Sequence, residues 1–108
     1  MKRKAASLAI VNTTVASAAE ARKLTRAIIK SRLAACVQTM PIHSVYRWRG
    51  KVESAPEFLL LMKTRATLVK KLMAFIKRHH SYEVPEILAM PVTAAHGKYR
   101  EWVEAETD

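Results

Sequence analysis

The chain has 108 residues, half of them apolar, with only two Gly and four Pro. This length supplies enough apolar surface for one core, so we expect a single domain over residues 1–108, with residues 1–6 as a flexible basic N-terminus. The composition excludes a disordered chain, and the formal net charge of +10 leaves two interpretations, a merely solvated surface or one that attracts polyanions.

Neither a secretion signal nor a membrane anchor is predicted. No apolar run approaches the roughly 20 residues that cross a bilayer, and the basic start at Met1 leads only into a short mixed stretch. The single cysteine, Cys36, cannot form an intrachain disulfide, which is typical of a reducing compartment. We therefore expect a cytoplasmic protein, and an oxidising compartment stays an open alternative.

The first predicted strand spans residues 7–14, where a short apolar run ends in β-branched side chains. Ser17 and Glu20 have capping-box spacing, so a helix should begin there and run to about Ser31. At helical spacing the apolar and cationic side chains fall on opposite edges: Ala21, Leu24 and Ile28 against Arg22, Arg26 and Lys30. The helix should therefore have a cationic outer face.

Two strands joined by a turn are predicted next. Residues 34–48 are rich in β-branched and aromatic side chains, and Pro41 should interrupt or bend this strand because proline donates no ladder hydrogen bond. The turn is Arg49-Gly50-Lys51. Residues 57–64 return as a strand with apolar side chains on both faces, so both faces should be buried.

Thr64 is predicted to cap a second helix that ends near Arg78. Its apolar stripe and its cationic edge again face opposite ways: Leu68, Leu72, Phe75 and Ile76 against Lys70, Lys71 and Lys77. Residues 84–92 are predicted to form a last strand containing Pro85 and Pro91, and residues 98–106 a terminal helix.

The predicted order is that of an α+β, ferredoxin-like βαββαβ sandwich with a C-terminal helix. The two crossover helices would cover one face of the sheet. The other face is also apolar, so something must cover it, and self-association is the simplest cover.

Five motifs occur in a fixed order along the chain. They are Leu33-Ala34-Ala35-Cys36, the run from Ser44 to Glu53, Lys63-Thr64, His80-Ser81-Tyr82-Glu83-Val84-Pro85-Glu86-Ile87, and Tyr99 with Trp102. In this order they resemble the CutA divalent-cation tolerance family, whose signature has Pro where this chain has Ser81. The resemblance covers about residues 8–104, and it implies a PII-like homotrimer with the sheets packed around a threefold axis.

The resemblance also implies divalent metal binding and tolerance. It carries copper ligation onto His79 and His80, which match a histidine pair in some bacterial members, and Glu83 could add an oxygen ligand. Copper(II), with zinc weaker, is the expected metal, and none should be required for folding. Those members place a Cys at the end of the first strand, where this chain reads Asn12-Thr13-Thr14, so a soft thiolate for copper(I) is missing. The alternative is a purely structural role for both histidines.

A subunit-interface cleft is expected around four residues in the family arrangement: Trp48, Lys63, Tyr82 and Glu86. Carboxylates such as Glu83 and Glu86 can do acid/base work, but no activated nucleophile or phosphate-binding Gly loop accompanies them, so we expect no enzyme. The alternative functions are PII-like signalling, or a basic interaction protein that binds an anionic ligand or nucleic acid. Weak, salt-sensitive polyanion binding is expected from the charge.

Overall fold

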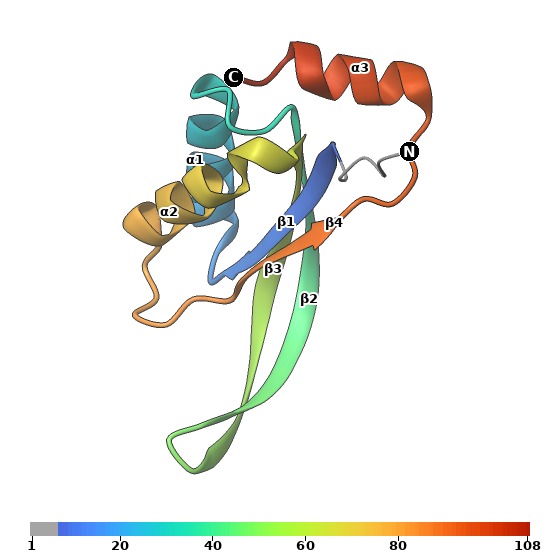
Figure 1. The fold of residues 1–108 in the computed structure, drawn as a ribbon. Helices are drawn as coiled ribbons and strands as arrows, with labels where there is room; N and C mark the ends of the chain where they lie inside the picture. Colours follow the sequence, from blue (N-terminus) through green and yellow to red (C-terminus); the bar gives the residue numbers. More distant parts are fainter. Residues whose placement is uncertain (1–6) are drawn as a thin grey trace.

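The chain folds into one four-stranded sheet with helices packed against it (Figure 1). The computed structural model describes residues 7–108, so the predicted N-terminal tail lies outside the described residues. Along the chain the elements are β1 (Leu8–Val15), α1 (Ala18–Lys30), β2 (Cys36–Trp48), β3 (Lys51–Arg65), the 3₁₀ turn η1 (Ala66–Leu68), α2 (Val69–His79), β4 (Ile87–Pro91) and α3 (Gly97–Ala105). The strand order is β2-β3-β1-β4, all antiparallel, which confirms the ferredoxin-like prediction.

The core lies between the sheet and the two crossover helices, α1 and α2, which cover the same face (Figure 1). The predicted apolar stripes of both helices face this core, and β1 and β3 contribute every second side chain to it from the sheet. Its fully buried large members include Val11, Val15, Ile28, Leu60, Met62, Leu72 and Ile76. Burying each of these side chains stabilises the fold by roughly 1.5–3 kcal/mol.

The start of α1 is capped as predicted, but only half of the capping box forms. Ser17 Oγ accepts a hydrogen bond from the Glu20 N–H at 3.1 Å. The Glu20 carboxylate instead accepts hydrogen bonds from the hydroxyl and the N–H of Ser81. The first turn of α1 is therefore tied to the segment that follows α2.

Pro41 does not interrupt β2, which is an edge strand, where proline is tolerated. Two other local predictions were wrong. Thr64 does not cap a helix: it stays in β3, and its hydroxyl donates to Leu33 O. The last strand is shorter than predicted, since only residues 87–91 pair with β1.

The β2–β3 hairpin extends beyond the rest of the sheet as a two-stranded arm, residues 42–48 and 51–57 (Figure 1). Arg49 and Gly50 have φ angles of 49° and 79° and form the predicted turn, which lets pairing begin at Lys51 rather than at residue 57. Beyond Phe58 the arm has no third strand. An isolated two-stranded ribbon is marginally stable in water, so the arm lacks the support that the remaining sheet has.

The face of the sheet opposite α1 and α2 is only partly covered. Leu59 and Leu61 of β3, on this face, are half-buried. Within a single chain, the prediction that both faces of residues 57–64 are buried is therefore correct only for the face that the helices cover. Apolar side chains stay exposed on the neighbouring strands and on the arm: Met40, Val45, Tyr46, Trp48, Val52, Leu88 and Met90.

The C-terminal helix packs across the end of the sheet and is held there by Arg65 of β3. The Arg65 guanidinium donates hydrogen bonds to the backbone oxygens of Glu104 and Thr107 and to the Thr107 hydroxyl. Val103 and Thr107 are fully buried beneath it. In the described range, no helix has both the length and the apolar character needed to cross a bilayer.

Candidate ligand-binding cleft

An open cleft of about 790 Å³ lies between the arm and the loop of residues 80–86. Both walls combine polar and apolar side chains. The arm side contributes His43, Ser44, Val45, Tyr46, Trp48 and Glu57, and the loop side contributes Ser81, Tyr82, Glu83, Val84 and Glu86, with Thr14 of β1 between them. The size and mixed lining are those of a site for a small ligand or for side chains of another subunit.

Tyr82 and Glu57 join the two walls. The Tyr82 hydroxyl donates to the Glu57 carboxylate at 2.7 Å, and Glu57 is only 7% exposed although it is charged. Burial raises the pKa of Tyr82 above its ordinary value, and the hydrogen bond to Glu57 raises it further. Tyr82 therefore stays a neutral donor, and the Glu57 carboxylate keeps a partner in a site that water reaches poorly.

The loop of residues 80–86 is fixed at several points besides Tyr82. Asn12 Nδ2 donates to Glu86 Oε2 at 2.6 Å, and the Ser81 hydroxyl donates to the Glu20 carboxylate. These contacts tie the loop to β1 and to α1, which are the most buried strand and the first helix of the fold. The loop side of the cleft is consequently preorganised rather than mobile.

His79 and His80 diverge although α2 ends between them. His79 is the last residue of α2: its Nδ1–H donates to Phe75 O at 2.9 Å, and its ring stacks on Phe75 with centroids 4.2 Å apart. His80 has an extended backbone, and its Nε2–H donates to Thr14 O at 2.8 Å. Its Nδ1 accepts the Tyr82 N–H at 3.0 Å. Both ring nitrogens of His80 are thus engaged: Nε2 holds the loop to β1, and Nδ1 makes a hydrogen bond within the loop.

The predicted site residues gather only in part. Trp48, Tyr82 and Glu86 line the cleft, and so does Glu83, whereas Lys63 lies on β3 outside the lining and donates to Gln38 Oε1. His79 and His80 are also outside the lining. Within residues 7–108, no three His, Cys, Asp or Glu side chains form a group suited to hold a metal ion.

Several residues of the site were not predicted as such from the sequence, among them Asn12, His43 and Glu57. Glu57 carried a signal, because a charged residue at the start of an otherwise apolar strand must find a partner when buried. Asn12 carried a similar signal as a polar side chain within a buried strand. His43, which shares a 2.6 Å hydrogen bond with Ser54 across the arm, had none.

The fold and the cleft define a class: a ferredoxin-like α+β protein with a C-terminal helix, a projecting hairpin arm and one uncovered sheet face. Comparison with known sequences places the chain within that class. The profile described as "CutA1 divalent ion tolerance protein" matches residues 9–106, and the chain belongs to this family.

Individual relatives agree with this assignment. The chain is 40% identical over 99 residues to the divalent-cation tolerance protein CutA of Thermus thermophilus, covering 91% of this chain and 96% of that protein. It is 42% identical over 99 residues to the chloroplastic CutA of Arabidopsis thaliana, covering 91% of this chain and 54% of that protein. The chain thus spans about half the length of the first curated relatives that it matches.

Solved structures of the family have the same fold. CutA1 of Oryza sativa superimposes with a TM-score of 0.92 at 39% identity, covering 96% of each chain. The Cut A1 protein of Thermus thermophilus superimposes with a TM-score of 0.89 at 39% identity, covering 94% of this chain and 99% of that one.

Proposed function

We propose that the chain acts in divalent-cation tolerance as a non-catalytic homotrimer that binds divalent metal. The observation that carries the proposal is the arm: a two-stranded ribbon with exposed Tyr46, Trp48 and Val52, standing beside a cleft that is open on its outer side. Such an arm needs packing partners, and a second copy of the chain would support the arm and close the cleft. Family membership supplies the link to divalent cations.

The assembly is tested by light scattering on the purified protein at micromolar concentration. We expect one species with three times the 12.2 kDa mass of the chain. A stable monomer would overturn the proposal, because the exposed side chains of the arm would then have no partner. A dimer would contradict the threefold arrangement.

The proposed metal ligands are His79, His80 and Glu83, with copper(II) preferred and zinc bound more weakly, because imidazole and carboxylate suit both ions. These three side chains do not converge among the described residues, so joint ligation requires both histidines to rearrange. Ligation by His80 must break the hydrogen bond of one ring nitrogen, either to Thr14 O or from the Tyr82 N–H. Such a bond contributes about 1 kcal/mol net, so its loss weakens binding about fivefold. The affinity should therefore be modest, and folding should not require the metal.

Calorimetric titration with copper(II) tests the ligand assignment. The double variant His79→Ala/His80→Ala should bind at least tenfold more weakly than the wild type. His96→Ala, which removes an exposed imidazole before α3, is the matched control and should bind normally. Circular dichroism must show that each variant is folded, since His80 also holds the loop to β1.

The two ways in which this titration can fail are distinct. Equal affinity in the wild type and in the double variant would refute the histidine assignment and leave both residues with structural roles. An absence of copper and zinc binding by the wild-type trimer would refute the metal-binding function itself.

A further inference from the structure

The outward surfaces of α1 and α2 carry eight exposed cations, which we call the basic helix face. Its members are Arg22, Lys23, Arg26, Lys30, Lys70, Lys71, Lys77 and Arg78. Glu20 is the one acidic residue in the two helices, and its carboxylate is bound to Ser81. Among residues 7–108, the ion pairs are those of Arg32 with Glu106 and Asp108, so the basic helix face is not neutralised within the described chain.

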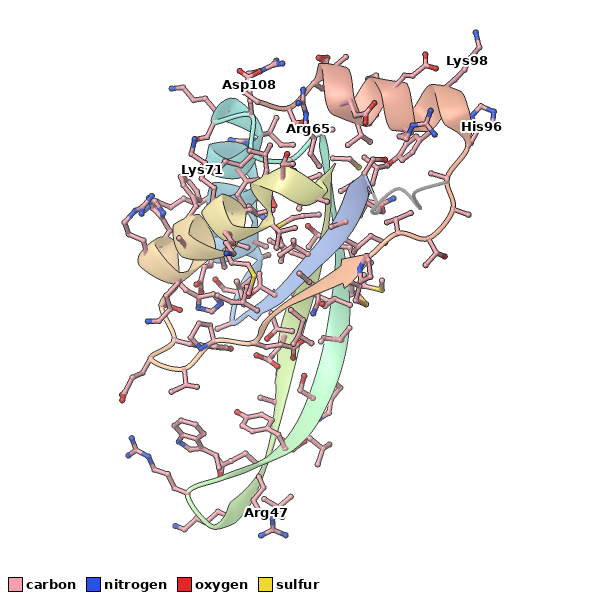
Figure 2. The ribbon with its side chains drawn as sticks, in the orientation of Figure 1. Arg47, Arg65, Lys71, His96, Lys98 and Asp108 are labelled. Carbon is pink, nitrogen blue, oxygen red and sulfur yellow. The ribbon has the colours of Figure 1, made fainter. Side chains whose placement is uncertain are left out.

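The two helices place these charges on the same side of the sheet. The start of α1 adjoins the end of α2, because Glu20 and Ser81 are hydrogen-bonded. The end of α1 adjoins the start of α2, because Thr64, two residues before η1, donates to Leu33 O at 2.6 Å. Both helices therefore lie on one side of the sheet, where α2 crosses α1 at an angle (Figure 1). Lys71 is labelled on that side in Figure 2, and Arg47 marks the distant tip of the arm.

Some of these cations lie where a helix disfavours them. Arg22, Arg26 and Lys30 are spaced four apart on α1, and each like-charged pair destabilises a helix by about 0.2–0.5 kcal/mol. Lys70 and Lys71 lie in the first turn of α2, where the helix dipole disfavours cations by about 0.3–1 kcal/mol. The same dipole favours cations in the last turns of the helices, at Lys30, Lys77 and Arg78. Solubility alone is served by mixed charges, so the uniform sign indicates an anionic partner.

The scarcity of exposed apolar side chains on the basic helix face indicates which class of polyanion it fits. Of the exposed large apolar residues found in the described chain, only Ile29, at 41%, lies on α1 or α2. A surface that binds single strands stacks bases on aromatic side chains, and a helix that enters a bilayer presents an apolar face. The basic helix face has neither feature. Cations without stacking or inserting side chains match the phosphate backbone of a duplex.

The dimensions agree with that partner. Helix α1 has 13 residues and is therefore about 20 Å long. Over about 20 Å, one strand of double-stranded DNA presents about six phosphates. We propose that the basic helix face binds the phosphate backbone of double-stranded nucleic acid without sequence preference. This face lies on the opposite side of the sheet from the uncovered apolar face, so it stays accessible if the chain self-associates through the latter.

The experiment measures fluorescence anisotropy of a labelled 20-base-pair DNA duplex with the full-length protein at 50, 100 and 200 mM NaCl. The wild type should bind in the micromolar range, and log K should fall with log salt with a slope of about −4.5 for about five phosphate contacts. The test variant carries four substitutions: Arg22→Gln, Arg26→Gln, Lys70→Gln and Lys71→Gln. It should bind at least tenfold more weakly at 100 mM NaCl and with a shallower slope.

A matched control removes the same charge elsewhere. Its two substitutions, Lys98→Gln and Arg100→Gln, lie on α3, away from the arm that the trimer proposal uses, and they match the charge change of the double variant Arg26→Gln/Lys71→Gln. This control should bind the duplex within threefold of the wild type. The double variant Arg26→Gln/Lys71→Gln should give an intermediate loss, and it serves as the test if the fourfold variant does not fold.

Three results would overturn the proposal. Equal losses in the double variant and the control would mean that net charge, and not the basic helix face, attracts the duplex. Tighter binding to a single strand of the same length would exclude the duplex as the preferred partner. Binding to phosphatidylserine vesicles without binding to the duplex would assign the face to an anionic membrane surface instead.

Discussion

Removal of the Tyr82 hydroxyl should isolate a buried carboxylate. Tyr82→Phe keeps the ring, whose centroid lies 4.9 Å from that of His80, but it removes the O–H that donates to Glu57. Glu57 is only 7% exposed, so water cannot fully replace this donor. Hydrogen bonds to charged groups contribute roughly 1.5–3 kcal/mol. We expect Tyr82→Phe to lower the free energy of unfolding by about 2 kcal/mol at pH 7.

Urea unfolding followed by circular dichroism measures this loss. For a chain of this size the free energy of unfolding falls by about 1–3 kcal/mol per molar urea, so the midpoint should shift down by about 1 M. The chain concentration must be the same for every variant, because self-association contributes to the measured stability. Tyr46→Phe is the matched control, because Tyr46 lines the same cleft but is 44% exposed. Loss of its hydroxyl should change the free energy of unfolding by less than about 0.5 kcal/mol.

The pH dependence of the difference in unfolding free energy between the wild type and Tyr82→Phe gives an independent check. Folding raises the pKa of Tyr82 above its ordinary value of 10.0, mainly through burial and then through the hydrogen bond to Glu57. The folded state therefore holds the phenol proton more tightly than the unfolded state does. The contribution of Tyr82 is complete below pH 10.0 and is lost as the pH rises above that value. The stability difference between wild type and Tyr82→Phe should consequently shrink in alkaline solution.

A double-mutant cycle separates the hydrogen bond from other effects. Glu57→Gln, Tyr82→Phe and their combination should show a coupling energy of at least about 1 kcal/mol. The reasoning fails if Tyr82→Phe is as stable as Tyr46→Phe, or if the two substitutions are additive. Either result would mean that water or another donor serves Glu57 in the folded protein.

Two further predictions concern the ends of the helices. Ser17→Ala should lower the free energy of unfolding by about 1 kcal/mol in urea titration, because the Glu20 N–H loses its cap, and an unchanged midpoint would contradict this role. Arg65→Ala should speed hydrogen exchange across residues 97–108 at least tenfold while exchange in α1 is unaffected, because Arg65 binds the backbone oxygens at the end of α3. In Arg100→Ala, the control, protection of α3 should persist.

Most of the fold follows from the sequence because its signals are local. The apolar spacing of Ala21, Leu24 and Ile28 predicted the buried side of α1, and all three residues are buried. Residues 51–56 were missed as strand because they lack apolar alternation: their pairing is set by the positive φ angles of Arg49 and Gly50 at the turn. Where turn geometry rather than burial decides pairing, hydrophobic patterning gives no signal.

The site was less predictable because its contacts join distant parts of the chain. The ring of His80 is held by Thr14 O, 66 residues away in sequence, and Asn12 meets Glu86 across 74 residues. An adjacent histidine pair at a helix end is equally compatible with convergence on a metal and with divergence toward separate acceptors. Only the packing of the loop distinguishes the two arrangements: His80 Nε2 binds Thr14 O of β1, and its Nδ1 binds the Tyr82 N–H within the loop.

Exposed apolar side chains lie on one face of the sheet, and cationic side chains lie on the helices that cover the other face. The chain can therefore self-associate and bind a polyanion at the same time. Self-association through the uncovered face would bring Met40, Leu88 and Met90 of neighbouring chains together, which is apolar burial and depends little on salt. The sheet and the layer of helices separate the basic helix face from the uncovered face in each chain. The basic faces of chains joined through their uncovered faces therefore lie further apart than the Debye length of about 8 Å at physiological ionic strength, and repulsion between them is largely screened. The +10 charge of each chain therefore does not oppose assembly strongly, and it stays on the outside, where a polyanion can reach it.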